Sequence, residues 1–453
     1  MNRTESLRQK DREMIWHPFT QMADWEKDMP LIIERGEGNT LIDTEGRRYF
    51  DGVSSLWVNV LGHRRREIDE AIRSQLERLA HSTFLGLSHV PAIELSERLL
   101  AIAPKGFSRV FYSDNGSTAM EIAIKMALQY WRQKGGSEKK QTFMTLTEAY
   151  HGDTIGAVSA GGIDLFHKIF QPLLFTTRRI PTPHCYRCPY GRVRKSCTLV
   201  CATRMEEEVR RHREELAAVI VEPLVQGAAG ILLMPDGYLA RLREVTQECG
   251  VLLICDEVAT GFGRTGTMFA CQQEGVSPDI MAVAKGLTGG YLPLAATLTT
   301  QEIYDAFLGR YEEFKAFFHG HSYTANPLGC AAAIATLSIF EQQGILRDVT
   351  SLSGVMAEEL AKLKGRPGIG DIRHKGLMVG IEIVKDGNTR VSFPPEEKVG
   401  QRVVRKVREK DIILRPLGDV IVLMPPLSST EDEIRHLVHS VGWAIAAVLS
   451  EGR

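Results

Sequence analysis

The sequence predicts an α/β fold in which a mostly parallel central sheet is covered by helices on both faces. Short apolar runs alternate with helical patterns through the middle of the chain, and turn residues bound each run. Runs that are apolar along their whole length, rather than at every second position, are typical of parallel strands buried on both faces. We expect such strands at 109–113, 142–146, 217–221, 251–255 and 280–284.

Composition excludes several classes of protein. The chain has 453 residues, with 55 Lys and Arg against 56 Asp and Glu, so its balanced charge argues against a dedicated nucleic-acid binder. Residues 1–14 are polar and lack the apolar core of a signal peptide, and no long uncharged apolar run predicts a membrane span. Eight cysteines in so long a chain do not suggest a secreted disulfide framework. We therefore expect a cytoplasmic globular protein.

The remaining elements follow in chain order. The first 60 residues are rich in strand and turn signals, and the spacing of Ile68, Ile72, Leu76 and Leu79 predicts a helix face. A second helix is expected over 117–134. After about residue 325 an Ala-rich helix leads into a region that mixes helices with strands, which we expect at 379–384, 412–415 and 420–423.

This change in the pattern of predicted helices and strands indicates two domains. Residues 61–330 are expected to form the large domain that holds the central sheet. Residues 1–60 and 331–453 are expected to form a smaller α+β domain that is built from both ends of the chain.

Polar clusters fall where the predicted strands end. In open α/β sheets the binding crevice lies beyond the carboxyl ends of the strands, so these clusters should meet in one crevice. They are Ser113 to Ser117, Tyr150 to Gly152, Glu222 with Pro223, Asp256 with Glu257, and Lys285.

Three of these clusters have chemistry of their own. Gly116 and Ser117 open a helix, whose free N–H groups favour an anion such as phosphate, although most such turns only cap a helix. Asp256 ends a buried strand, where a carboxylate requires a cation or several donors. Desolvation would lower the pKa of Lys285 and make its amine a nucleophile, whereas an isolated lysine is more often a solvated surface residue.

A glycine pattern and a cysteine cluster each have a functional and a structural interpretation. Residues 261–266 satisfy G-x-G-x-x-G, but the glycines come five residues after the strand and no full helix follows, so we interpret them as structural turns. Four cysteines beside His184 have a spacing that can hold zinc or an iron–sulfur centre, or that can serve as small packing residues of a loop. They are Cys185, Cys188, Cys197 and Cys201. The other four, Cys249, Cys255, Cys271 and Cys330, are expected in the core, and no metal is assigned.

The segment DEVATGFGRTG at 256–266, followed by Lys285 and Gly286, resembles the class III aminotransferases that use pyridoxal phosphate (PLP), over nearly the whole chain. Shorter motifs resemble the branch of this family that forms 7,8-diaminopelargonic acid in biotin synthesis. They are WHPFTQM at 16–22, SSLW at 54–57, ALQYW at 127–131, YHGDT at 150–154, FHG at 318–320 and RPLG at 415–418. The resemblance implies the type I fold of PLP-dependent transferases and a homodimer with shared active sites.

The resemblance also implies roles for single residues. Lys285 would hold PLP through an imine and then act as general base and acid, and Asp256 would pair with the pyridinium nitrogen. Gly116 and Ser117 would bind the phosphate. Four further residues would complete the cofactor site: Tyr150 and Val258 on the two ring faces, Gln226 at the ring hydroxyl and Glu222 in support.

Substrate and partner contacts are implied in the same way. Arg415 would bind the carboxylate of 8-amino-7-oxononanoate, and Trp57 and Tyr150 would line its channel near Phe19. Without the resemblance, Trp57 could equally be a core residue and Arg415 a surface ion pair. Residues of one subunit would reach the neighbouring active site, with the last of them on its phosphate: Gly320, His321 and Ser322.

The sequence departs from the family pattern on the donor side. Phe19 replaces a tyrosine common in synthases that use S-adenosylmethionine, and His321-Ser322 replaces Pro-Thr, so the pattern is more similar to a branch that uses L-lysine. The amino donor is therefore expected to be S-adenosylmethionine or L-lysine. The alternatives are another ω-amino-acid aminotransferase of class III and, from a different class, a non-catalytic metal- or cofactor-binding protein on the same fold.

Overall fold

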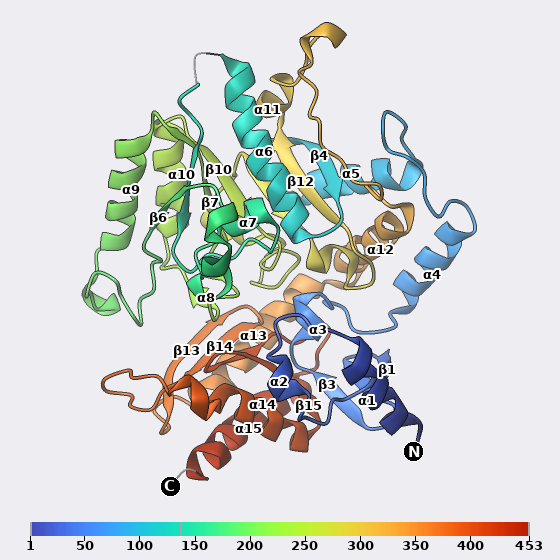
Figure 1. Ribbon diagram of the computed structural model, residues 1–453, viewed down its shortest axis with the longest axis vertical. Helices are drawn as coiled ribbons and strands as arrows, with labels where there is room; N and C mark the ends of the chain where they lie inside the picture. The colour runs from blue at the N-terminus through green and yellow to red at the C-terminus, as the bar shows by residue number, and fades with distance from the viewer. Residues whose placement is uncertain (1, 136–137, 452–453) are drawn as a thin grey trace.

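The computed structural model describes residues 2–135 and 138–451, and a seven-stranded sheet forms its centre (Figure 1). All strands run parallel except β12, which is antiparallel to both of its neighbours. The predicted α/β class, with its mostly parallel sheet, is confirmed. In sheet order the strands are β4 (Phe107–Ser113), β12 (Ala295–Thr300), β11 (Ile280–Val283), β10 (Leu252–Asp256), β7 (Leu216–Val221), β5 (Thr142–Leu146) and β6 (Thr177–Ile180).

The central strands are buried on both faces, as their continuous apolar sequence requires. Every residue of β7, β10 and β11 is buried. Ala218 and Ile220 pack with helix α6 (Gly116–Lys134) on one face, while Val219 and Val221 join the core with α10 (Tyr238–Glu248) on the other. Alternate side chains therefore enter two separate apolar layers, and each large side chain buried in this way stabilises the fold by about 1.5–3 kcal/mol.

Two strands and one helix end differ from the prediction. The polar composition of β6 and the small residues of β12 hid both strands, which lie outside the predicted runs. Helix α4 (Arg66–Leu76) ends before Leu79, which lies beyond the helix that its spacing predicted. Leu76 itself is exposed, so the apolar stripe is shorter than expected.

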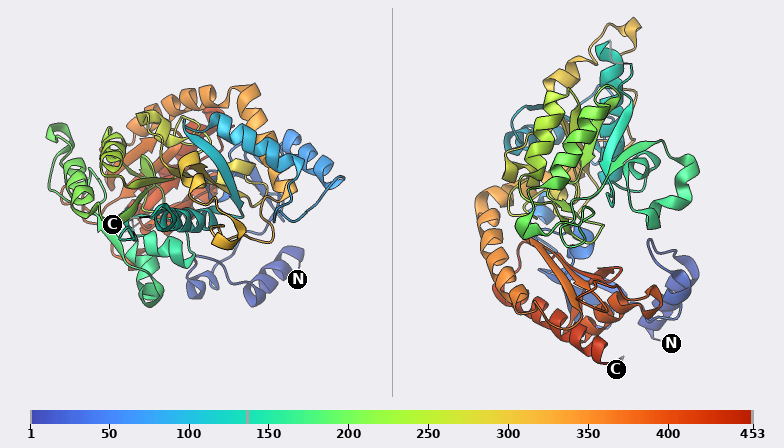
Figure 2. Two further views of the ribbon diagram at one scale, coloured as in Figure 1. Left: turned by 90° about the horizontal axis from the view of Figure 1, so that it is seen from above. Right: turned by 90° about the vertical axis from the view of Figure 1, so that its left-hand side faces the viewer.

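A second lobe, below the central sheet in Figure 1, contains both chain termini. Its antiparallel sheet has the order β13-β14-β17-β16 and is covered by three helices (Figure 2). The strands are β13 (Ile369–Lys375), β14 (Met378–Ile383), β17 (Val420–Leu423) and β16 (Arg415–Leu417), and the helices are α13 (Ile345–Ala361), α14 (Val399–Val407) and α15 (Glu431–Ser450).

The N-terminal strands pair with the C-terminal part of the chain. β1 (Ile33–Glu37), β2 (Thr40–Asp43) and β3 (Arg48–Asp51) form a sheet that β15 (Ile412–Ile413) joins in parallel to β3. The predicted single strand over 412–415 is wrong, because β15 and β16 belong to different sheets. Pro416 fits the edge position of β16, where a residue without an N–H group is tolerated.

The strand-rich prediction for the N-terminus also missed a helix. Helix α1 (Arg3–Met14) has few apolar residues, so it gives no periodic signal. A capping box begins it, in which the side chain of Asn2 accepts from the Glu5 N–H and Glu5 accepts from the Asn2 N–H.

Further elements connect these layers. The Ala-rich helix predicted after residue 325 is α12 (Pro327–Gln343). No helix within 2–135 and 138–451 has the length and apolar character needed to cross a membrane. The other elements are α2 (Met22–Trp25), α3 (Ser54–Trp57), α5 (Val90–Ile102), α7 (Ile155–Ala160), α8 (Asp164–His167), α9 (Val200–His212), α11 (Gln301–Asp305), β8 (Val225–Gln226) and β9 (Leu232–Leu233).

Candidate active site

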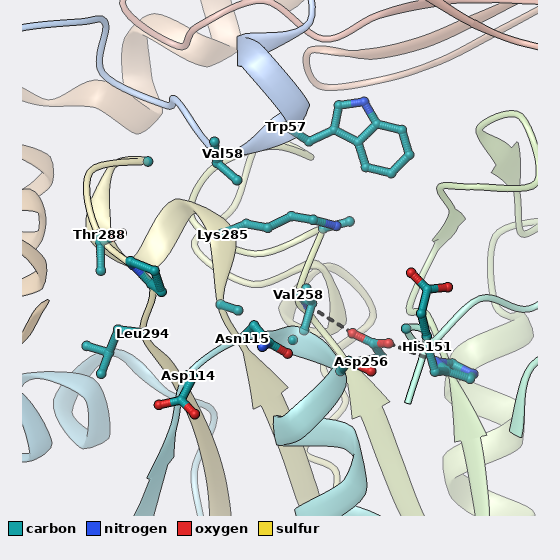
Figure 3. Close-up of a pocket in the computed structure, with 18 of the residues that line it drawn as sticks. Trp57, Val58, Asp114, Asn115, His151, Asp256, Val258, Lys285, Thr288 and Leu294 are labelled. Atoms are coloured by element: carbon teal, nitrogen blue, oxygen red, sulfur yellow. Dashed lines mark hydrogen bonds and ion pairs between the residues drawn. The ribbon is translucent and has the colours of Figure 1, made fainter. Parts of the chain in front are cut away.

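The polar clusters at the strand ends meet in one cavity of about 700 Å³, at the carboxyl edge of the central sheet (Figure 3). Each of the five predicted clusters contributes at least one residue to its lining. Glu257 and Pro223 do not line it. Glu257 is fully buried and accepts instead from the Thr260 hydroxyl and the Cys271 N–H. Eight predicted site residues line the cavity: Trp57, Gly116, Ser117, Tyr150, Glu222, Asp256, Val258 and Lys285.

The N-terminus of α6 faces this cavity. Asn115 caps the helix, and Gly116 follows with a backbone so close to Val258 that a Cβ there would lie 2.5 Å from its Cγ1. The Ser117 hydroxyl lies 2.8 Å from Oγ1 of Thr154 and accepts from the Thr154 N–H at 3.0 Å. A 19-residue helix thus presents its positive end and a fixed hydroxyl to the cavity, which suits a phosphate group.

Asp256 is held between two partners at the end of β10. Its Oδ2 lies 2.7 Å from Nδ1 of His151, and its Oδ1 accepts from the Val258 N–H at 3.0 Å. Burial disfavours a charged imidazole, but the hydrogen bond and charge of Asp256 outweigh it and raise the pKa of His151. The pair therefore places a hydrogen-bonded carboxyl group at the wall of the cavity.

Lys285 extends beneath the indole of Trp57 and above the Asp256–His151 pair (Figure 3). Its Nζ lies 4.9 Å from the Trp57 ring centre. Burial lowers the pKa of Lys285, against the opposing charges of Asp256 and Glu222. The backbone of Lys285 has φ +46°, a conformation that costs energy for a side chain and is common at functional sites. The amine is thus prepared to react as a nucleophile or base.

Glu222 lines the cavity and Gln226 lies outside it. Glu222 accepts from the N–H groups of Tyr150 and Gly227, at 3.1 and 2.8 Å. Burial raises the pKa of this carboxyl group to about 7. Gln226 does not line the cavity. It donates to the Thr147 carbonyl, and its buried Oε1 has no hydrogen-bond partner in the described chain.

Tyr150 forms a side wall of the cavity. Its hydroxyl donates to Asp153 at 2.8 Å, and its ring stacks on His167 with an interplanar angle of 12°. Burial raises the pKa of this phenol, so it stays protonated at neutral pH. The ring is therefore a neutral, fixed aromatic surface.

Phe19 and Arg415 lie in a neighbouring cavity of about 950 Å³, which shares Ala228 with the first. The Arg415 guanidinium lies 5.8 Å from the Phe19 ring centre. It has no ion pair within the described residues, unlike most arginines of this chain. The alternative of a surface ion pair for Arg415 is therefore not what the structure shows.

Three predicted residues lie outside both cavities in a single chain. Gly320 and Ser322 are exposed, and the Nδ1 of His321 lies 2.7 Å from Oδ2 of Asp114, which does line the first cavity. His321 thus touches the rim of its own site.

Cys185, Cys188 and Cys197 of the loop between β6 and α9, and Cys201 of α9 itself, line one small cavity of about 20 Å³ together with His184. In the described chain, the only three potential metal ligands with atoms within 4.8 Å of one another are His184, Asp371 and Glu382, and Arg373 already pairs with both carboxylates. The thiols therefore do not form a closed ligand set. Cys255, Cys271 and Cys330 are buried as expected, but Cys249 is only partly buried.

Sequence reasoning missed the role of His151, which stood in a recognised motif beside Tyr150. It also missed Thr154, which fixes the Ser117 hydroxyl. Both contacts join residues more than 30 positions apart, so no local pattern signals them. The segment at 261–266 forms turns without a following α-helix, as predicted.

Comparison with known proteins agrees with this geometry. The chain is 56% identical over 452 residues to the adenosylmethionine-8-amino-7-oxononanoate aminotransferase of Nitratidesulfovibrio vulgaris, covering 100% of this chain and 83% of the relative. The crystal structure of the Methanocaldococcus jannaschii enzyme of that name superimposes with a TM-score of 0.94 at 47% identity, covering 98% and 99%. An amine transaminase from an uncultivated Pseudomonas species, solved with PLP bound, gives 0.91 at 38% identity, covering 96% and 98%.

These likenesses extend along nearly the whole chain. The family model for class-III aminotransferases matches residues 21–445. The predicted resemblance is therefore confirmed, and the chain belongs to the class-III aminotransferase family.

Proposed function

We propose that this protein is the aminotransferase of biotin synthesis that moves an amino group from S-adenosylmethionine to 8-amino-7-oxononanoate and forms 7,8-diaminononanoate. The observation that carries the proposal is the cavity in which the buried Lys285, the carboxyl group of Asp256 and a helix N-terminus face one another. The full-length relatives at up to 56% identity, which are named for this reaction, support it.

The residues of the cavity fit PLP. The phosphate would lie at the N-terminus of α6 against Gly116 and Ser117, and a Cβ at Gly116 would displace Val258, which also lines the cavity. The ring would lie between Tyr150 and Val258, with its nitrogen toward Asp256, and the unpartnered Oε1 of Gln226 could accept from the ring hydroxyl. When bound, the pyridinium ring supplies an electron sink for the substrate's carbon.

The chain's own groups handle the proton. Lys285 Nζ, whose pKa burial lowers, takes a proton from the amine-bearing carbon of the donor and later gives one to the former carbonyl carbon of the acceptor. Asp256, hydrogen-bonded to His151, would face the ring nitrogen. Trp57 covers Lys285 and excludes water from this transfer.

The second cavity is the proposed acceptor channel. Arg415 forms no ion pair there with any residue of 2–135 or 138–451, and it can bind a carboxylate through two N–H groups. The apolar chain of the ketone would then run past Phe19 and Ala228 toward Lys285, because Ala228 lines both cavities.

The donor in this proposal is not L-lysine, which the departures of this sequence from the family pattern favour. Phe19 and His321-Ser322 are more similar to a lysine-using branch, yet the relatives at 45–56% identity are named for adenosylmethionine. We therefore give more weight to similarity over the whole chain than to three residues, and take S-adenosylmethionine as the donor.

Homodimerisation and a cytoplasmic location are part of the same proposal. Large apolar side chains stand exposed around the segment that carries Gly320 and Ser322, among them Phe318 and Tyr323 at 72% and 64% exposure. A second subunit would cover them and bring Ser322 to the neighbouring phosphate site. Sedimentation of the purified protein as a dimer, and fractionation of cells, would test these two points.

A second candidate is a broader ω-amino-acid aminotransferase, because an amine transaminase is also structurally similar to this chain. The two are separated by assaying amine transfer to 8-amino-7-oxononanoate beside transfer from β-alanine and 4-aminobutyrate to pyruvate. Transfer to 8-amino-7-oxononanoate with a much higher kcat/KM supports the proposal. Transfer between the ω-amino acids and pyruvate alone would reject it.

A further inference from the structure

The carboxylate of Asp51 is fully buried at the end of β3, outside both cavities. Its Oδ1 accepts from the Ser55 N–H at 2.7 Å and its Oδ2 from the Ser55 hydroxyl at 2.8 Å. The Nε2 of His63 lies 3.0 Å from the same Oδ2. A buried carboxylate is tolerated only with such partners, and here both oxygens hold a single loop.

The loop that Asp51 holds has a strained backbone. Ser54, Ser55 and Trp57 have φ angles of +50°, +62° and +65°, in the left-handed region that side chains disfavour. The Ser54 hydroxyl donates to the Met424 carbonyl at 2.8 Å. Such a conformation persists only where the surrounding contacts over-determine it, and here Met424 holds Ser54 while Asp51 holds Ser55.

Trp57, at the end of this loop, has little freedom to move without altering the site. Its indole lies over Lys285 Nζ, 4.9 Å from ring centre to nitrogen. On its other edge, a Cβ at Gly227 would come within 3.1 Å of the Trp57 Cζ3. Gly227 in turn donates its N–H to Glu222. The ring therefore fits between the reactive amine and the turn that supports Glu222.

We infer that Asp51 is a positioning residue of the active site: by clamping Ser55 it fixes the strained loop that holds Trp57 over Lys285. The inference rests on the proposed function for its kinetic consequence. Asp51 thereby fixes the position of Trp57, against which the ketone would lie. Asp51 acts through Trp57 and does not itself touch the substrate. The acceptor channel begins close by in the chain, since Ile413 of β15 lies opposite Asp51 and Arg415, in β16, follows two residues later.

The test compares Asp51→Asn with Asp43→Asn in the PLP-loaded protein. Asp43 is a matched control, because it is also buried in this sheet and accepts from the N–H groups of Glu45 and Arg47. It lies at the opposite end of the β2–β3 hairpin, next to Arg47. Asn at position 51 keeps the acceptor for the Ser55 N–H but replaces the oxygen that receives the hydroxyl and His63.

Asp51→Asn should raise the KM for the ketone by about tenfold, since small displacements of a positioned group have large kinetic effects. Asp43→Asn should leave KM within about twofold even where both variants unfold at lower temperature. The decisive comparison is a double-mutant cycle that combines Asp51→Asn with Trp57→Phe. If Asp51 acts through Trp57, Asp51→Asn should add little to the effect of Trp57→Phe. Additive effects would overturn the inference.

A readout without turnover separates this inference from the proposed function. The chain has five tryptophans, and the fluorescence lost in Trp57→Phe defines the contribution of Trp57. Acrylamide should quench that component more strongly in Asp51→Asn, and in the milder Ser55→Ala if Asp51→Asn fails to fold. Unchanged quenching in the folded variant would contradict the clamp, whatever substrate the enzyme uses. Increased quenching in a protein that does not convert the ketone would reject only the proposed substrate.

Discussion

The carboxylate of Asp256 and the imidazole of His151 form a buried ion pair, with 2.7 Å between Oδ2 and Nδ1. The pair lies below Lys285 in the same cavity, and the hydrogen bond and charge of Asp256 raise the pKa of His151 against the opposing effect of burial. The site therefore contains a carboxyl group that is held by a basic partner, and this arrangement is suited to facing a cationic ring nitrogen.

His151→Asn should lower kcat by about ten- to a hundredfold, because asparagine can donate a hydrogen bond to Asp256 but carries no charge. The cofactor should also bind less tightly in an absorbance titration. His436→Asn is the control, since that imidazole lies on the second lobe, where its Nε2 is 3.1 Å from the Lys410 carbonyl oxygen. Wild-type kcat in His151→Asn would show that the charge is not needed.

Lys285→Ala should abolish turnover, because no other amine lines the cavity in the described chain. Lys140→Met is a suitable comparison: burial also lowers the pKa of Lys140, but its amine donates to three backbone carbonyls. That variant should unfold at a lower temperature and still turn over substrate. Residual turnover by Lys285→Ala would remove this residue from the reaction and would favour the non-catalytic interpretation.

Glu222 should make stability depend on pH. Burial raises its pKa from an ordinary 4.5 to about 7, so between these values the folded state holds a proton that the unfolded state has lost. The free energy of unfolding should therefore fall as pH rises through this window, by on the order of 1–3 kcal/mol. In Glu222→Gln this decline should be smaller, whereas the exposed control Glu214→Gln should match the wild type in urea unfolding at pH 5 and 8. An unchanged decline in Glu222→Gln would contradict the assignment.

Arg415→Leu should raise the KM for 8-amino-7-oxononanoate by about ten- to a hundredfold, the loss of a charged hydrogen-bonded contact. The donor half-reaction with S-adenosylmethionine should change less, because the proposed role of Arg415 concerns the acceptor. Arg402→Leu, which removes a surface ion pair with Glu451, serves as control. An equal loss in both half-reactions would argue against a specific carboxylate site.

Removal of metal should leave activity unchanged. No three of the four thiols beside His184 have sulfur atoms within 4.8 Å of one another. The small cavity that they line therefore does not present a complete set of metal ligands. Dialysis against a chelator, followed by elemental analysis and assay, checks this. Stoichiometric zinc whose removal inactivates the enzyme would contradict the geometry.

Much of the sheet could be predicted because buried parallel strands have a recognisable, continuously apolar sequence. The run 142–146 coincides with β5, and 280–284 with β11 to within one residue, since continuous burial requires continuous apolar sequence. β6 has two arginines and α1 is almost wholly polar, so neither carries a hydrophobic period. Their positions depend on tertiary pairing and capping rather than on pattern.

The candidate site was predictable to the extent that it lies at strand ends. Lys285 and Asp256 follow their strands directly, and the crevice rule places them together. The His151–Asp256 pair and the Asp51 clamp depend on contacts between side chains that only the folded chain brings together. Gln226 was predicted as a site residue but does not line the cavity. It follows the cavity residue Glu222 by four positions in the chain, and its side chain donates to the Thr147 carbonyl instead.

The donor half-reaction tests the central claim most directly. PLP-loaded protein is mixed separately with S-adenosylmethionine and with L-lysine, and loss of the visible absorbance of the bound cofactor is followed. Each mixture then receives 8-amino-7-oxononanoate, and 7,8-diaminononanoate is measured by mass spectrometry. The account predicts loss of absorbance and product with S-adenosylmethionine. Product with lysine alone would mean that Phe19 and His321-Ser322 mark a lysine-using enzyme, and absence of product with either donor would contradict the proposed acceptor.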